Sequence, residues 1–261
     1  MTDAHVSRLI EARPGRRWRI GVEQGSDPGA PTVLALHGFA SDAETNWRRS
    51  GWVGALAAAG FATVLPDLFG HGGSDKPHRA ACYSQEDLQQ DVVAILDELR
   101  LDRVHVLGYS FGARLGWGLA SRFPERVATL SLGGLPSDEP LRRFDVAAAR
   151  SFIAGAPTDL DGFTGGFLAM AKALPGNDPR ALVAFAEGAR VGPAVRELPP
   201  PTQPLLLVTG TADDVAPDTA ELLAIRPDAE FVELPARTHA NAISARGFKQ
   251  RVLDHLAAHP R

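Results

Sequence analysis

The chain has 261 residues, a length that suits one α/β domain, and 22% of them are charged, with a formal net charge of −4 at pH 7. This balance argues against a nucleic-acid-binding protein, although arginines cluster between positions 13 and 19. The only cysteine, Cys82, excludes an intramolecular disulfide and favours a reducing, cytoplasmic compartment.

No apolar stretch has the length that a membrane-spanning helix needs. The most apolar one, residues 55–65, contains a glycine and ends at Pro66. The first five residues, Met1 to His5, lack the apolar segment of a signal peptide. We therefore expect a soluble protein that acts on a small molecule and binds neither membrane nor nucleic acid.

Strand and helix patterns alternate along most of the chain. Residues 17–23 alternate with period two, as in an outer antiparallel strand. Apolar runs predict strands at 32–36, 61–65, 104–107, 127–132 and 204–209, and a further strand is predicted at 230–234. Helical patterns occupy 52–59, 84–100 and 112–122. This alternation predicts a mostly parallel central sheet covered by helices on both faces.

Residues 108–112 read Gly-Tyr-Ser-Phe-Gly, at the junction of a predicted strand and a predicted helix. A serine in such a turn is pushed out of the backbone with its hydroxyl free to attack. The flanking glycines leave room where strand and helix approach each other. The letters alone are common in a glycine-rich chain, but this context makes Ser110 a candidate nucleophile.

An acid and a histidine follow Ser110 in the order that a Ser–acid–His triad requires. Asp213 and its neighbour Asp214 come after the strand at 204–209, and His239 comes after the strand at 230–234. A serine hydroxyl becomes a good nucleophile when a histidine takes its proton, and a carboxylate orients the imidazole ring. The chain has no metal-ligand spacing, so we expect neither a metal nor a cofactor.

The segment His37-Gly38-Phe39 follows the strand at 32–36. Backbone N–H groups just after such a strand, together with the N–H after the nucleophile, can bind an oxyanion. The predicted donors are the N–H groups of Phe39 and Phe111. The side chains and backbone nearby, His37, Gly38 and Tyr109, are expected to line the substrate pocket.

With these motifs in order, the chain resembles the α/β-hydrolase family from roughly Trp18 to Leu256. The resemblance implies the α/β-hydrolase fold and a serine nucleophile with no cofactor. Its Gly-x-x-Asp-x-x-x-Pro spacing favours Asp213 over Asp214. One departure is Thr238, where family members often have glycine before the catalytic histidine. Members that act on halides or epoxides carry Asp at the nucleophile position, where this chain has Ser110.

Residues 136–201 interrupt the strand–helix alternation with alanine-rich helical pieces at 144–152, 167–174 and 181–189. By the same resemblance this segment is a helical cap that excludes water from the site. The predicted core then consists of residues 1–135 and 202–261.

Arg114, one helical turn after Ser110, has two interpretations. Some family members with an arginine here handle carboxylate-bearing substrates, which suggests a carbon–carbon bond hydrolase, a lactonase or a lyase. Alternatively, Arg114 is a helix residue paired with an acid of the scaffold. The leading prediction is a serine hydrolase that cleaves a small or medium carboxylic ester through an acyl-enzyme. A ligand receptor without turnover is the third hypothesis.

Overall fold

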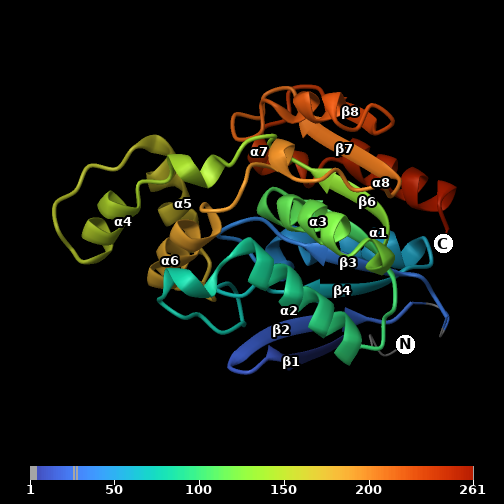
Figure 1. Cartoon of the computed structure of the whole chain (residues 1–261), viewed down its shortest axis with the longest axis horizontal. Coiled ribbons are helices and arrows are strands. Elements are labelled where there is room, and N and C mark those ends of the chain that lie inside the picture. Colours follow the sequence, from blue (N-terminus) through green and yellow to red (C-terminus); the bar gives the residue numbers. More distant parts are fainter. Residues whose placement is uncertain (1–4, 26, 28, 261) are drawn as a thin grey trace.

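The computed structural model describes residues 5–25, 27 and 29–260 (Figure 1). Residues 1–4, on which most of the signal-peptide expectation depends, lie outside the described residues, as do residues 26, 28 and 261. No helix in the described ranges is long and apolar enough to cross a membrane.

One eight-stranded sheet forms the centre of the molecule, with strand order β1-β2-β4-β3-β5-β6-β7-β8. β2 pairs antiparallel with β1 and with β4, whereas the other neighbours are parallel. The strands are β1 His5–Arg13, β2 Arg16–Glu23, β3 Thr32–Leu36, β4 Ala62–Pro66, β5 Val104–Tyr109, β6 Val127–Gly133, β7 Leu205–Gly210 and β8 Glu230–Leu234. The predicted mostly parallel sheet is therefore confirmed, although the sequence analysis missed the edge strand β1.

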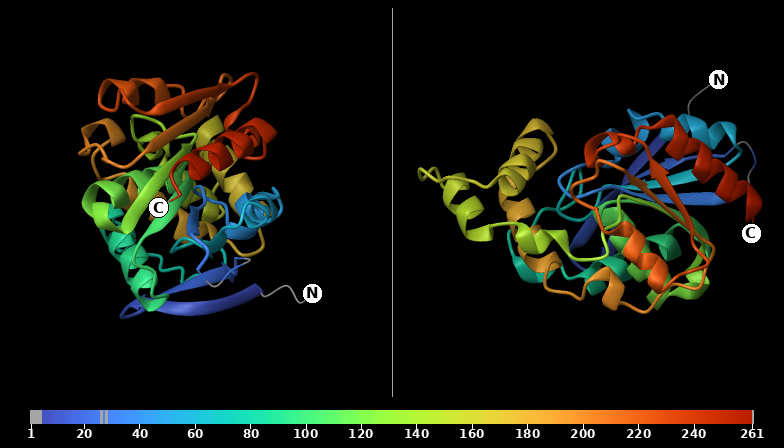
Figure 2. Two further views of the ribbon diagram at one scale, coloured as in Figure 1. Left: turned by 90° about the vertical axis from the view of Figure 1, so that its right-hand side faces the viewer. Right: turned by 90° about the horizontal axis from the view of Figure 1, so that it is seen from above.

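Helices cover both faces of the sheet (Figures 1 and 2). α2 (Gln85–Glu98) and α3 (Phe111–Arg122) pack on one face, and α1 (Trp52–Ala58) and α8 (Arg246–Ala258) pack on the other. Each face of the sheet buries its own apolar cluster. Central strands such as β5 and β6 are therefore buried along their whole length. Burial on both faces explains why these strands read as continuous apolar runs.

Between β6 and β7 the described chain forms no strand and contains three longer helices. They are α4 (Val146–Ile153), α5 (Gly162–Ala173) and α6 (Pro179–Ala189), and they lie to one side of the sheet (Figure 1). α5 begins five residues before the predicted helix at 167–174. Asp161 caps it by accepting the N–H of Thr164, and this cap compensates for Gly162, Gly165 and Gly166, which weaken the helical pattern.

Shorter helical turns connect these elements. They are the π-helical turn Glu44–Arg48, the 3-10 turns Ala80–Cys82, Pro124–Arg126, Pro140–Arg143, Val195–Glu197 and Thr219–Ala224, and the four-residue helix α7, His239–Ala242. Two of them, Glu44–Arg48 and α7, lie beside the site described below.

Two histidines are buried on the side of the sheet opposite Ser110. His105 is the second residue of β5 and is joined to Thr129 Oγ1 of β6 by a 2.9 Å hydrogen bond, and His255 is buried on α8. Burial lowers the pKa of His105 to about 4 and that of His255 to about 4. Both side chains are therefore neutral at pH 7.

These two histidines predict a loss of stability in mild acid. The unfolded chain, with a histidine pKa of about 6.5, binds more protons than the folded chain between about pH 6.5 and 4. The free energy of unfolding should therefore fall as the pH drops through this range. Denaturant unfolding at several pH values should show that the free energy of unfolding falls less steeply with decreasing pH in His105→Leu and in His255→Leu than in the unchanged protein. An identical pH slope in both variants would contradict this assignment.

Candidate active site

Ser110 lies in a sharp turn between β5 and α3. Its backbone has φ 55° and ψ −120°, which is unusual for a residue with a side chain and indicates local strain. The two glycines of the motif make the turn possible. A Cβ at Gly112 would lie 2.0 Å from the carbonyl oxygen of Leu36 in β3, and a Cβ at Gly108 would lie 2.6 Å from Ala113 Cα. Strand, turn and helix are thus too close for any larger residue at either position.

The three side chains that the sequence indicated lie in one hydrogen-bonded chain. Ser110 Oγ lies 2.9 Å from His239 Nε2. On the other side of the ring, His239 Nδ1 lies 2.9 Å from Asp213 Oδ2 and 3.0 Å from Oδ1. Ser110 comes from the end of β5, Asp213 follows β7, and His239 opens α7 after β8. The parallel sheet brings these three strand ends to one edge.

Asp213 is buried, whereas Asp214 is exposed. Burial alone would raise the pKa of Asp213. The hydrogen bond and charge of His239 and the N–H groups of Val215 and Ala216 outweigh burial, and they hold this pKa below its usual range. The carboxylate next to His239 is therefore ionised at neutral pH.

Two residues beside His239 hold the ring in its place. Tyr109 donates its hydroxyl to the carbonyl oxygen of His239 at 2.6 Å, and the two ring centroids are 5.3 Å apart. Gly134, after β6, has φ 56°, and a Cβ there would lie 2.9 Å from His239 Cε1. Sequence reasoning missed Gly134, because only the folded chain brings it against the imidazole.

The turn after β3 lies against Ser110, since a Cβ at Gly38 would lie 3.3 Å from Ser110 Cβ. The N–H of Gly38 donates to Asn46 Oδ1 and the N–H of Ala40 donates to His71 Nε2. Between them, the N–H of Phe39 has no acceptor in the described part of the chain. Phe111 is the first residue of α3, so its N–H lacks an intrahelical acceptor.

His37 differs from the expectation that it lines the pocket. Its ring is fully buried behind the turn, where Nε2 accepts the N–H of Leu68 and Nδ1 donates to the carbonyl oxygen of Gly38. Burial lowers the pKa of His37 and lowers that of His71 still further. Two neutral imidazoles therefore connect the turn after β3 to the turn after β4, and His37 acts on the site only through the backbone.

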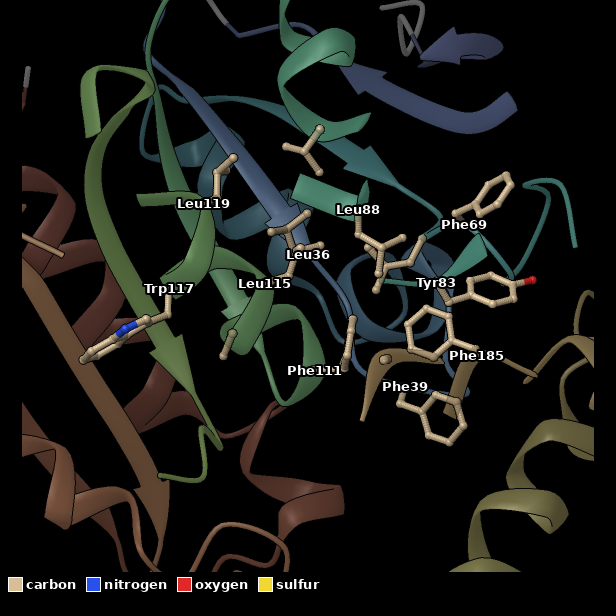
Figure 3. Packing of buried hydrophobic residues seen from close by; sticks show 14 of the residues in the cluster. Leu36, Phe39, Phe69, Tyr83, Leu88, Phe111, Leu115, Trp117, Leu119 and Phe185 are labelled. Carbon is tan, nitrogen blue, oxygen red and sulfur yellow. The ribbon is translucent and has the colours of Figure 1, made fainter. Parts of the chain in front are cut away.

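An aromatic cluster packs over the residues that carry these two amides (Figure 3). Phe185 of α6 lies between them, with ring centroids 5.6 Å from Phe39 and 4.8 Å from Phe111. Phe167 of α5 packs on Phe39 at 5.1 Å. The helices between β6 and β7 therefore contact the site directly through aromatic side chains.

Two cavities meet at Ser110, and Phe39 and Phe167 border both of them. The inner cavity holds about 20 Å³ and extends over Phe111 towards Arg114. The outer cavity holds about 380 Å³ and is bordered by Gly38, Tyr109 and His239. A small recess and a larger open space thus both border Ser110.

Arg114 borders the inner cavity and is also paired with an acid. It is 2% exposed, and its Nε lies 2.8 Å from Oε2 of Glu139, which is 3% exposed. Its Nη2 donates to the carbonyl oxygen of Pro193 at 2.6 Å. Burial lowers the pKa of Arg114 and raises that of Glu139, and each opposes the effect on the other through its charge. Arg114 therefore both borders the cavity beside Ser110 and is paired with an acid of the scaffold.

This buried pair predicts a strong penalty for removing either member alone. Arg114→Leu or Glu139→Leu should each lower the free energy of unfolding by about 3–5 kcal/mol, because the remaining charge stays buried without its partner. The double variant should lose clearly less free energy of unfolding than the sum of the two single-variant losses. Denaturant unfolding of all four proteins measures this coupling, and additive losses would mean that the two charges do not depend on each other.

Within residues 5–25, 27 and 29–260, no group of three or more His, Cys, Asp or Glu side chains is arranged to hold a metal ion.

Comparison with known proteins places the chain in a family. The family model of the alpha/beta hydrolase fold matches residues 31–165, and the chain belongs to this family. This match confirms the resemblance and the fold predicted from the sequence.

Among curated relatives, epoxide hydrolase A of Mycobacterium tuberculosis is 34% identical over 149 residues, which are 57% of this chain and 44% of that protein. Bifunctional epoxide hydrolase 2 of Sus scrofa is 34% identical over 140 residues, 52% of this chain and 24% of that protein. The matched part thus spans less than half the length of these relatives.

Solved structures match nearly the whole chain. An enol-lactonase from Burkholderia xenovorans superposes with a TM-score of 0.78 at 22% identity, covering 96% of this chain and 100% of the other. A Vigna radiata epoxide hydrolase mutant superposes with a TM-score of 0.77 at 17% identity, covering 98% and 99%. At such identities the likeness shows the fold alone.

Proposed function

We propose that this chain is a serine hydrolase that cleaves a small or medium carboxylic ester through an acyl-enzyme intermediate. The observation that supports this best is the continuous contact from Ser110 Oγ through the ring of His239 to the buried carboxylate of Asp213. A hydroxyl, a base and an ionised acid at these distances have the arrangement that nucleophilic acyl transfer needs.

In the first half of the reaction, Ser110 Oγ forms a bond to the ester carbonyl carbon while its proton passes to His239 Nε2. Asp213 stabilises the resulting imidazolium and keeps its Nδ1–H directed at the carboxylate. The tetrahedral intermediate then breaks its bond to the alcohol oxygen, and that oxygen takes the proton from His239. The products of this half are a free alcohol and an acylated Ser110.

In the second half, water adds to the acyl carbon and gives a proton to His239, which returns it to Ser110 Oγ as the acid leaves. In both halves, negative charge develops on the former carbonyl oxygen. The N–H groups of Phe39 and Phe111 are the proposed donors to this oxyanion, and each is worth about 3 kcal/mol of transition-state stabilisation. The side-chain acceptors for Gly38 and Ala40 hold the Phe39 amide in a fixed turn.

An ester is favoured over an epoxide, although the curated relatives are named epoxide hydrolases. If Ser110 opened an epoxide, its oxygen would bind an alkyl carbon and form an ether. An ether has no carbonyl carbon for water to attack, so the oxyanion donors could not assist release of the product. A serine nucleophile is therefore suited to acyl groups.

We assign residues 136–201 to a cap and residues 1–135 and 202–261 to the core. The contacts of Phe167 and Phe185 with Phe39 support this division, because they place aromatic side chains of the inserted helices over the site. The cap would exclude water from the reacting ester. The lone Cys82 supports a cytoplasmic location, and the acidic net charge supports a small-molecule substrate over nucleic acid.

A second candidate uses the same three residues to open a lactone or to act on a carboxylate-bearing substrate. Arg114 at the inner cavity favours it. Glu139 opposes it, because this carboxylate already neutralises Arg114 and would repel a second anion beside it. The buried pair therefore disfavours a carboxylate-bearing substrate, whereas a neutral lactone stays the second candidate.

The nucleophile can be tested by labelling. A fluorophosphonate probe should label the protein at Ser110, and Ser110→Ala should lose labelling and at least about 10³-fold in turnover of a short 4-nitrophenyl ester. The matched control is Ser121→Ala, a serine on α3 that lies outside both cavities and should keep both properties. Labelling at another residue would contradict the mechanism, and saturable ligand binding with no turnover of any ester would favour a receptor.

The acid can be tested with neighbouring aspartates. Asp213→Asn should lower kcat by about 10³–10⁴-fold, because an amide cannot stabilise the imidazolium or fix its tautomer. Asp214→Asn makes the same change one residue away, on an exposed side chain, and its kcat should stay close to that of the unchanged protein. Steady-state kinetics on one ester measures both variants, and equal losses would remove Asp213 from its assigned role.

A further inference from the structure

The two cavities at Ser110 differ greatly in size, and the position of His239 determines which part of an ester each one takes. The histidine gives its proton to the leaving alcohol oxygen, so the alcohol has to lie on the histidine side of Ser110. His239 borders the outer cavity and does not border the inner one. The outer cavity therefore suits the alcohol, and the inner cavity suits the acyl group.

The inner cavity is small because bulky side chains from three segments close it. Leu141 belongs to the turn Pro140–Arg143, Phe163 and Phe167 belong to α5, and Phe39 follows β3. The remaining volume of about 20 Å³ is close to the minimum that one water molecule needs, which is roughly the space for a methyl group. Beyond the carbonyl carbon, the acyl group has room for about one more heavy atom.

The lining of the inner cavity carries two charges that cancel. Arg114 and Glu139 both border it, and they are paired with each other within the protein. An acyl group with its own charge would meet one repulsive partner and break a buried pair. The cavity therefore selects an uncharged acyl group as well as a small one.

The outer cavity has the opposite character. Its volume of about 380 Å³ accommodates a ring-sized alcohol. Its lining combines the apolar side chains of Phe167, Met170 and Ile243 with hydroxyl, amide and guanidinium groups from Ser41, Asn46 and Arg49. A large alcohol that carries both apolar and polar groups matches this mixed lining.

From these four observations we infer that the enzyme removes a small uncharged acyl group, of acetyl size, from a larger alcohol that carries both apolar and polar groups. This inference rests on the proposed ester hydrolysis and specifies its substrate class. The bond that breaks is the one between the acyl carbon and the alcohol oxygen. The released alcohol takes the proton of Ser110 through His239, and water then supplies the hydroxyl group of the released small acid and restores the proton of Ser110 through His239.

The acyl preference is tested with 4-nitrophenyl acetate, butyrate and hexanoate, which share one leaving group. The value of kcat/KM should fall at least about tenfold from acetate to butyrate and again to hexanoate, since extra methylene groups do not fit the inner cavity. Butyrate or hexanoate turning over as fast as acetate would overturn the inference while leaving ester hydrolysis intact. The proposed function itself fails if no ester is hydrolysed or if Ser110 is not the labelled residue.

Two widening variants test which cavity binds the acyl group. Phe163→Ala and Leu141→Ala should each raise the butyrate-to-acetate ratio of kcat/KM at least about tenfold. Phe152→Ala is the matched control, because it removes the same ring from α4, which borders neither cavity, and it should keep the original ratio. The ratio does not depend on the folded fraction, so a partly unfolded variant still gives an answer. An unchanged ratio in both widening variants would overturn the assignment.

The alcohol side is tested with phenyl acetate and 1-naphthyl acetate, which share one acyl group. The naphthyl ester should have a kcat/KM at least equal to that of the phenyl ester, because the outer cavity has room for the second ring. Hydrolysis of phenyl acetate without hydrolysis of 1-naphthyl acetate would contradict the assignment of the outer cavity to the alcohol.

Discussion

The close backbone approach between α3 and the end of β3 is the constraint on which the site depends. At Gly112 the two elements leave no space for a Cβ, and the turn that joins β5 to α3 holds Ser110 at φ 55°. This strained turn presents the hydroxyl towards His239 and brings the first N–H of α3 next to the turn after β3. Ser110 and the two proposed oxyanion donors are thus positioned by one backbone contact, and the rest of the sheet supports it.

Much of this arrangement could be predicted from the sequence because its signals are local. Continuous apolar runs mark strands buried on both faces, and glycines on either side of a serine mark a turn too tight for a Cβ. The choice between Asp213 and Asp214 rested on the spacing typical of the family that the chain resembles, and in the structure the first is buried against His239 and the second is exposed. The catalytic roles of Ser110, Asp213 and His239 stay predictions until they are tested by kinetics.

Other features could not be predicted because they depend on residues far apart in the chain. Glu139 pairs with Arg114 only after the segment following β6 folds back over α3. His37 was wrongly expected to face the pocket. Its buried position depends on a hydrogen bond from the backbone N–H of Leu68, which lies far away in the chain. The inner cavity is closed by Leu141 and Phe163, and no local pattern indicates that these two side chains meet beside Ser110.

The central claim is that the hydroxyl of Ser110 carries the acyl group during turnover. The most direct measurement is acid quenching of the enzyme during steady-state hydrolysis of an acetyl ester, followed by mass spectrometry of the proteolytic peptides. An acetyl adduct is expected on the peptide that contains Ser110, and a longer-lived adduct is expected when hydrolysis of the intermediate is slowed. Turnover accompanied by an adduct on a different residue, or by none under conditions that trap acyl-enzymes, would contradict it.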